Sequence, residues 1–464
     1  MGERGEPTET MQRTEGTARA DAENRGDSRG HPCVDSCLDR GAGRDRRVWW
    51  GFAFGLLLLC AGMIRMGLYH GFGPRGTDDQ YYYAQARSLL LDGNLDLHNE
   101  LSTLTPRPEN INTSTTRAWD EPTATGRVAC KYGIGAPLLL LPFLAVGQGM
   151  AWLFSSQGAA VDGYGLFPYL GWSLGNLFYA GLALVLVYRI LRSWAGLTPA
   201  WSFVATWAAF LSGPLLYQTI SDPYMAHVPS MAMVCLAAAF LFLDKTNSRS
   251  SFLAAGLSLG LAIATRQSNV VYLALFLPRL LDRDLVLARN RWRRLALPAG
   301  LGLLLGFLPQ LIAWQYLYGS PLYYSYEGEG FHILAPHFYE NLLGVRAGLF
   351  FWNPGWALAL LLFPWRTRAL LGLTLATVAL VWLNSAWWCW WWGDTYGGRA
   401  YSSLFLPVSI GMATLLQASS THRLWRSLTL LVLLAACLYS ARRIHLMEVS
   451  YPTQRALQAW QPFR

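Results

Sequence analysis

The sequence predicts an all-α integral membrane protein with about 11 transmembrane helices and a long first outer loop carrying amphipathic surface helices. Hydrophobic residues make up 53% of the 464 residues and charged residues only 14%, against roughly 25% charge in soluble domains. Apolar runs long enough to span a bilayer recur along the chain, and Arg and Lys gather in alternate connections. The net charge of +9 is therefore explained by topology, and a nucleic-acid partner is excluded.

The first 47 residues are rich in Gly, Arg, Glu, Asp, Thr and Ser. Such a segment buries too little apolar surface to offset its ordering entropy, so a disordered cytoplasmic tail is expected over residues 1–47. A first span is predicted at residues 49–69, and Arg44, Arg46 and Arg47 immediately before it place the N-terminus inside.

Further spans are predicted along residues 48–442, which form the polytopic domain, and a short C-terminal tail is expected over 443–464. The spans fall at 166–188, 199–218, 228–243, 252–265, 268–281, 295–317, 348–364, 369–386, 401–417 and 427–441. With this count, every predicted inner connection is basic. Only Arg442 and Arg443, which fall on the outer side, break the pattern.

The apolar stretch 134–147 is treated as a membrane-hugging or re-entrant helix and not as a span. It holds only about 14 strongly apolar residues, and a crossing here would invert the agreement with the positive-inside rule. Residues 71–165 are therefore expected to stay outside as one long loop, and the candidate polar residues then gather on the outer face.

The first candidate motif is TDDQYYY at residues 77–83, which precedes Asp92 and Gly93. Helical spacing of Tyr82 with later apolar residues predicts an amphipathic surface helix. Asp78 and Asp79 fit a base or a metal ligand at a membrane-surface site. They also fit a helix start, in which Thr77 and Gln80 form a capping box.

Three further candidates follow in the outer segments. Lys131 begins a KYGIGAP motif and suits a phosphate, although snorkelling explains it equally well. His227 opens a span after SDPYMA, and a structural histidine is the competing interpretation. Arg266 lies between two short apolar segments, where either a phosphate or snorkelling accounts for it.

The last two candidates are rich in aromatic residues. Arg346 begins RAGLFFW, and a Trp-rich run leads through Trp392 to GDTYGGR, which contains Asp394 and Arg399. An interfacial aromatic belt explains the Trp residues, but not the Gly-Asp-x-x-Gly-Gly-Arg pattern that follows them. Aromatic faces beside an acid and an Arg suit a sugar and its phosphate.

In their order and common sidedness, these motifs resemble the GT-C superfamily of integral-membrane glycosyltransferases, over about residues 48–440. The relevant branch includes protein O-mannosyltransferases and the lipid A aminoarabinose transferase, and the resemblance is to its bacterial members. The acidic pair after the first span is Asp78-Asp79 where the family usually has Asp-Glu. This departure puts a metal or base role for Asp79 in doubt.

The resemblance implies transfer of a sugar from a polyprenyl-phosphate carrier to a glycan, lipid or protein acceptor at the outer face of the plasma membrane, with inversion. Asp78 and Asp79 are then the catalytic candidates. The donor-phosphate candidates are Lys131, Arg266, Arg346 and Arg399, and the candidates for sugar or acceptor binding are His227, Tyr82, Trp392 and Asp394. If a divalent metal takes part, Asp78, Asp79 or His227 would hold it.

A transporter or flippase of a lipid-linked sugar is the alternative. It predicts ionisable residues near the bilayer midplane and paired repeats with broken helices. The short pair of segments around Arg266 favours it, whereas the clustering of charge at one face and the absence of a convincing internal repeat favour the transferase.

Overall fold

The computed structural model describes residues 34–104, 121–244, 246–281, 291–393 and 395–458. Contacts divide the chain after Arg47, and residues from Val48 onward form one unit. Within the described ranges this unit is helical, apart from a single isolated bridge between Phe331 and Trp387. The prediction of an all-α membrane protein is confirmed.

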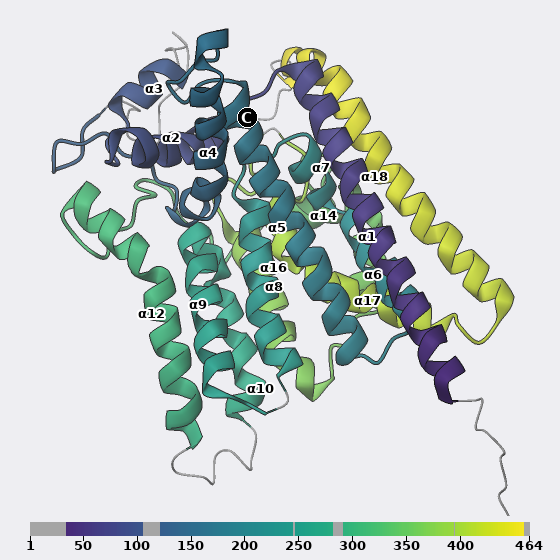
Figure 1. Ribbon diagram of the computed structural model, residues 1–464. Coiled ribbons are helices and arrows are strands. Elements are labelled where there is room, and N and C mark those ends of the chain that lie inside the picture. The colour runs from purple at the N-terminus through teal and green to yellow at the C-terminus, as the bar shows by residue number, and fades with distance from the viewer. Residues whose placement is uncertain (1–33, 105–120, 245, 282–290, 394, 459–464) are drawn as a thin grey trace, which may run out of the picture. The chain divides into compact units, whose positions relative to one another are not determined.

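The helices follow one another along the chain, and the longest irregular segments among the described residues are 121–134 and 319–337 (Figure 1). In chain order they are α1 (Val34–His70), α2 (Thr77–Arg87), η1 (Ser88–Asp92), α3 (His98–Leu104), α4 (Gly135–Leu153), η2 (Ser155–Gln157), α5 (Leu166–Ser193), α6 (Pro199–Leu211), α7 (Pro214–Ile220), α8 (His227–Leu243), α9 (Arg249–Thr265), η3 (Gln267–Phe276), α10 (Leu277–Leu280), α12 (Arg291–Tyr318), α13 (Phe338–Leu342), α14 (Leu349–Trp352), α15 (Pro354–Leu361), η4 (Arg368–Leu370), α16 (Leu371–Ala386), η5 (Arg399–Leu404), α17 (Phe405–Ala418) and α18 (Arg423–Gln458).

Every span predicted from the sequence falls on one helix or on two consecutive helices. Seven helices of the described chain are long and apolar enough to cross a membrane on their own, and three shorter apolar helices accompany them. The predicted count of about 11 is not fixed by these lengths. Of the expected tails, residues 1–33 and 459–464 lie outside the described part. The helix α1 begins within the expected N-terminal tail, and the helix α18 ends within the expected C-terminal tail.

The helices α1 and α5 lie side by side and antiparallel. Trp49, near the start of the first span, packs on Tyr188 with ring centroids 5.9 Å apart. At the other end, a Cβ on Gly73 would lie 3.1 Å from the Tyr169 ring. The end of α1 and the start of α5 therefore share one end of the bundle, and the segment 71–165 leaves and returns at that end. We call this end the site end and the opposite one the basic end.

The helix α4 is longer than the expected stretch 134–147, because apolar residues continue the helix to Leu153. It packs antiparallel along only the first half of α5, from the close approach of Gly147 to Pro168 to the hydrogen bond from Tyr179 to the Leu139 carbonyl at 2.9 Å. With α2 and α3 it lies at the site end, whereas α10 lies at the basic end (Figure 1). This placement fits a helix that does not cross the whole bundle, although its length and composition alone suit a span.

The helix α2 is more enclosed than an amphipathic surface helix, because Tyr82, Tyr83, Ala84 and Ala86 are all buried. It ends in the π-turn η1, which Gly93 closes at a φ of +68°. A π-turn is commonly found at functional sites. Here it brings the chain back onto α2.

The helices α9 and α12 are joined by glycines whose missing side chains let the backbones touch. A Cβ on Gly302 would lie 2.1 Å from the Leu253 carbonyl oxygen, and one on Gly256 would lie 2.1 Å from that of Ala299. Small residues at such positions are the usual means of close helix packing in lipid. The α9–α12 contact holds the end of α9 in place, and this end adjoins the candidate site.

We therefore expect Gly302→Ala to destabilise the protein by about 1–3 kcal/mol, the range for overpacking a close contact. Thermal unfolding of the purified protein in detergent measures the effect. Gly300→Ala is the matched control, because a Cβ at Gly300 in the same helix meets nothing within 4 Å. Equal unfolding temperatures for the two variants would contradict the packing described.

Candidate functional site

Asp78 lies at the site end between two groups that come from distant parts of the chain. Its Oδ1 accepts a hydrogen bond from the Tyr132 hydroxyl at 2.5 Å, and its Oδ2 pairs with Arg399 Nη2 at 3.0 Å. The side chain of Arg399 is 12% exposed and that of Asp78 is 29% exposed. Charge-assisted bonds to a partly buried carboxylate hold it in one orientation. The predicted acid and one predicted phosphate ligand are thus in direct contact.

Asp79 points in a different direction and closes the start of α2. Its Oδ2 accepts from the backbone N–H groups of Arg75 at 2.7 Å and Gly76 at 2.9 Å, and the residue is 2% exposed. Burial, and then the nearby charge of Asp222, raise the pKa of Asp79 to about 7. The expected capping box of Thr77 and Gln80 is wrong by one position, because Gly76 is the N-cap. These contacts make Asp79 a helix-capping residue, and its catalytic role stays a prediction.

The glycines of the KYGIGAP motif let this segment touch the end of α9 backbone to backbone. A Cβ on Gly133 would lie 2.1 Å from the Ala264 carbonyl oxygen, and one on Gly135 would lie 2.4 Å from the Thr265 nitrogen. The Ile134 N–H also donates to Gln310 Oε1 of α12 at 2.9 Å. The motif therefore fixes Tyr132 beside the residue that follows α9, which is Arg266.

Lys131 is held by a carboxylate and by aromatic rings. Its Nζ forms an ion pair with Glu329, and the Trp388 indole donates to the other oxygen of Glu329 at 3.1 Å. The ammonium also lies 5.7 Å from the centre of the Tyr132 ring and 5.4 Å from that of Tyr326. Lys131 adjoins Asp78 through Tyr132, but its charge is already matched by Glu329.

Arg266 and His227 meet at the break between α9 and η3. Arg266 Nη1 lies 2.8 Å from His227 Nδ1 and 3.3 Å from the Ala400 carbonyl oxygen. Since a guanidinium only donates, Nδ1 accepts and the imidazole proton is assigned to Nε2. Arg266 interacts electrostatically with both Asp78 and Arg399. Both of its hydrogen-bond acceptors are uncharged.

The backbone that presents Arg266 is fixed by Asn269. The Asn269 amide donates to Ser230 Oγ at 2.6 Å and to the Ala262 carbonyl at 2.8 Å, and its oxygen accepts from Ser403 at 3.0 Å. One side chain thus ties together α8, α9 and η5. This network explains how an extended residue and the long 3₁₀ segment η3 persist within a bundle of α-helices.

Arg399 is positioned by the docking of two sequence motifs. The Gly398 N–H donates to the Ala347 carbonyl at 3.1 Å, and Asn353 donates to the Gly397 carbonyl at 3.1 Å. Gly398 has a φ of +79°, and a Cβ on Gly393 would lie 3.4 Å from the Arg399 guanidinium. The glycines of GDTYGGR therefore permit the loop to wrap around this guanidinium, which accounts for the pattern that an aromatic belt leaves unexplained.

The remaining sequence candidates are placed as follows. Tyr82 is buried and interacts electrostatically with Asp78 and Arg266. Trp392 stacks on Trp387 at 6.1 Å, as part of an aromatic wall that continues to Tyr326. Arg346 is an exposed residue, and its guanidinium lies 4.6 Å from the centre of the Trp391 ring. Asp394 lies outside the described residues.

Two charged residues of the site were not selected from the sequence. The side chain of Asp222 interacts electrostatically with Arg399, Arg75 and Asp78, and its pKa is raised to about 6, chiefly by burial. Arg75 donates to the Ser221 carbonyl and lies 4.0 Å from Glu448 of α18. The SDPYMAH motif contains Asp222, and an acid beside a proline before a span is the sequence signal for it.

The described residues contain no group of three or more His, Cys, Asp or Glu side chains that could hold a metal ion. Asp78 is paired with Arg399, Asp79 with backbone N–H groups, and His227 with Arg266. The guanidinium beside Asp78 and the one beside His227 disfavour binding of a divalent metal ion at either residue. The donors present suit an anion better than a metal.

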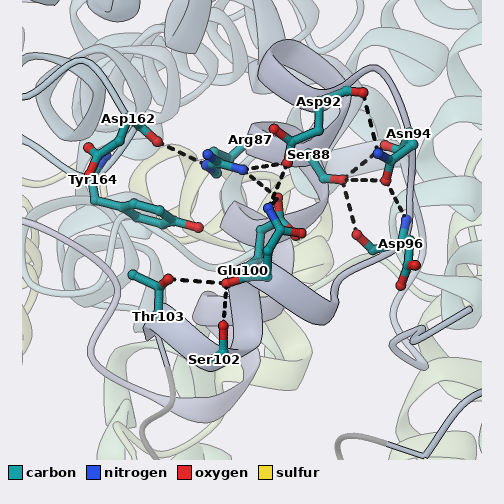
Figure 2. Close-up of polar contacts among 12 residues, drawn as sticks. Arg87, Ser88, Asp92, Asn94, Asp96, Glu100, Ser102, Thr103, Asp162 and Tyr164 are labelled. Atoms are coloured by element: carbon teal, nitrogen blue, oxygen red, sulfur yellow. Dashed lines mark hydrogen bonds and ion pairs between the residues drawn. The ribbon is translucent and has the colours of Figure 1, made fainter.

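A second polar cluster holds the long loop together, around the Asp-Gly turn at the end of η1 (Figure 2). Arg87 Nη1 contacts Asp92 at 2.5 Å and Glu100 at 2.6 Å, and its Nε donates to the Asp162 carbonyl at 2.9 Å. The guanidinium also lies 4.9 Å from the centre of the Tyr164 ring. One arginine therefore joins α2, η1, α3 and the segment before α5, which makes Asp92 a structural residue.

We expect Arg87→Gln to destabilise the protein by about 3 kcal/mol, because it leaves the fully buried Glu100 beside Asp92 without its cation. Thermal unfolding at pH 7 in detergent measures this. Burial raises the pKa of Glu100 to about 7 from its ordinary value of 4.5, so Glu100→Gln imitates the protonated form and serves as the matched control.

The control also has a pH dependence of known sign. Between about pH 4.5 and 7 the native Glu100 keeps a proton that the unfolded chain has released, so wild-type stability falls relative to Glu100→Gln as the pH rises through this window. A stability difference that does not change over this range would contradict the assignment.

Comparison with known proteins gives similarity to solved structures only. No protein-family model matches the chain, and no curated protein matches it. ArnT from Cupriavidus metallidurans bound to undecaprenyl phosphate shares 13% identity at a TM-score of 0.46, over 78% of this chain and 58% of that one.

The Archaeoglobus fulgidus oligosaccharyltransferase is similar to the same degree. Its apo form shares 13% identity at a TM-score of 0.47, over 86% of this chain and 56% of that one. Its complex with Zn and sulfate shares 14% identity at a TM-score of 0.46, over 85% and 52%. The chain thus spans little more than half the length of these structures. Every one of these TM-scores is below 0.5.

Proposed function

We propose that this protein is a membrane glycosyltransferase that uses a sugar linked to a polyprenyl phosphate. The observation that carries the proposal is the pair of guanidiniums at the site end. Arg266 and Arg399 interact electrostatically with each other, and among the described residues Arg266 bonds to two uncharged acceptors. Two arginines brought together attract an anion, and their planar forks suit a phosphate.

Asp78 is the proposed general base. It accepts the proton of an acceptor hydroxyl while the hydroxyl oxygen forms a bond to the anomeric carbon of the donor sugar. The bond between that carbon and the phosphate oxygen breaks with inversion, and the polyprenyl phosphate leaves with the electron pair. Arg399, which already contacts Asp78, and Arg266 stabilise the charge that develops on the departing phosphate.

The sugar is proposed to lie against the aromatic wall beside Asp78. Tyr132 is bonded to Asp78, Tyr326 lies 6.3 Å from Tyr132 between ring centroids, and Trp387 lies 5.6 Å from Tyr326. Trp392 continues the wall. Aromatic faces supply apolar contact for a sugar ring without fixing which sugar is bound.

The site is proposed to face the outer side of the plasma membrane. The site end is opposite the connections that hold Arg189, Arg192, Arg249, Arg279 and Arg368, and the positive-inside rule assigns such connections to the cytoplasm. Arg443, an exception to that rule, lies 4.2 Å from the centre of the Trp352 ring. Aromatic contact accounts for its position without a cytoplasmic location.

Replacing Asp78 with Asn is expected to lower sugar transfer at least 10²-fold, the lower limit for loss of a general base. The assay follows radiolabelled sugar from a panel of undecaprenyl-phosphate-linked hexoses and pentoses in membranes that carry the variant. Glu327→Gln, an exposed acid of the long loop before α13, is the matched control. Near-normal transfer by Asp78→Asn at equal expression would contradict the assignment of Asp78 as the general base.

Replacing Arg266 or Arg399 with Gln is expected to weaken binding of undecaprenyl phosphate about tenfold or more, because each variant removes a charge-assisted contact. Binding of the radiolabelled lipid to purified protein measures this. Arg127→Gln is the matched control, since Arg127 lies over the Tyr316 ring and bonds to its carbonyl. Unchanged binding in both site variants would refute the phosphate site, whatever the transfer assay gives.

A further inference from the structure

A cavity of about 480 Å³ opens at the basic end of the bundle. Its walls come from the end of α5, the end of α8, η3, α10 and η4, and they include Trp194, Phe242, Leu275, Pro278, Arg279 and Arg368. The helix α5 is 28 residues long, and its two ends lie at opposite ends of the bundle. Along α8, His227 of the candidate site and Leu241 of the cavity wall lie about 20 Å apart, so the cavity is separate from the site described above.

Two arginines reach this cavity from different elements, and each is fixed by a carbonyl oxygen. Arg279 Nη2 donates to the Leu241 carbonyl of α8 at 3.0 Å, and Arg368 Nη2 donates to the Leu281 carbonyl at 3.3 Å. A guanidinium has five N–H donors. One bond each leaves further donors on both arginines for an anion in the cavity.

Capping of helix ends explains part of this arrangement only. Arg279 neutralises the carbonyl end of α8, as a basic residue near a helix C-terminus does. That role requires one donor of one arginine. It does not account for Arg368, which lies on the short helix η4 and lines the same cavity. The convergence of both cations on one space requires an additional reason.

The rest of the cavity is apolar. Trp194 meets Phe242 edge to face with ring centroids 5.4 Å apart, and Leu275 and Pro278 complete the wall. A small soluble anion gains nothing from such a surface. A molecule with a phosphate at one end and hydrocarbon beside it satisfies both the guanidiniums and the apolar wall.

We propose that this cavity binds the phosphodiester head group of an anionic phospholipid of the inner leaflet. Arg279 and Arg368 contact the phosphate, and Trp194 and Phe242 contact the glycerol and the upper acyl chain. Basic pockets between helices at the cytoplasmic side are suited to such lipids. This site does not rest on the proposed transferase activity, because it shares no residue with the candidate site.

The test measures thermal stabilisation and lipid retention by native mass spectrometry for the purified full-length protein in neutral detergent. The probes are phosphatidylglycerol, phosphatidylcholine and inorganic phosphate. Phosphatidylglycerol is expected to raise the unfolding temperature and to remain bound, and the two other probes are expected to do so much less. The double variant Arg279→Gln/Arg368→Gln is expected to lose this preference at least fivefold.

Arg366→Gln is the matched control, because Arg366 is exposed, lies two residues from Arg368 and is not part of the cavity wall. If the double variant does not fold, Arg368→Gln alone removes only the exposed arginine and is expected to lower the preference by about half. Equal retention of phosphatidylglycerol by Arg368→Gln and wild type would overturn the proposal, as would equal stabilisation by inorganic phosphate.

Binding of undecaprenyl phosphate separates this site from the proposed function. Arg279→Gln/Arg368→Gln is expected to bind undecaprenyl phosphate as wild type does, whereas Arg266→Gln is expected to retain phosphatidylglycerol. Loss of both lipids in either variant would show that the two ends of the bundle are not independent and would overturn the proposal.

Discussion

The arrangement of the site depends on the backbone contact between the KYGIGAP segment and the end of α9. Gly133 and Gly135 lie so close to Ala264 and Thr265 that any side chain would collide with the backbone. Through this contact the long loop is fixed to the bundle at the point where α9 ends. Tyr132, which holds Asp78, is thereby placed beside Arg266. The candidate site is thus formed jointly by residues of the long loop and residues of the helical bundle.

Breaks in the helices supply the polar groups that this space requires. An intact apolar helix offers no free backbone donors or acceptors within a membrane. Here the break after Thr265 exposes Arg266, and the turn before η5 presents Arg399 and the Ala400 carbonyl. The polar groups exposed by the breaks are satisfied by buried side chains, of which Asn269 and Asn353 are the clearest. Asn269 both donates and accepts in this role, whereas the Asn353 amide donates to the Leu349 and Gly397 carbonyl oxygens.

Most of the fold was predictable from the sequence, because apolar length and basic connections depend only on local composition. Every predicted span coincides with helix, and Asp78, Arg266, His227 and Arg399 were all candidates. The predictions that failed or were incomplete depend on direction and register. The start of α2 lies one residue earlier than predicted, so Asp79 and not Thr77 caps the first turn of the helix. The contribution of Asp222 depends on how α7 and α8 pack, and no periodicity reports this packing.

The two ends of the bundle use charge in different ways, and this difference bears on function. At the basic end, Arg279 and Arg368 bond to carbonyl oxygens and keep donors directed at an amphipathic cavity. At the site end, acids and bases contact one another: Asp78 pairs with Arg399, and Lys131 with Glu329. A cation that only orients a helix has no need of a carboxylate partner. Mutual pairing at the site end holds several charges in fixed positions, which is what the proposed transfer mechanism requires.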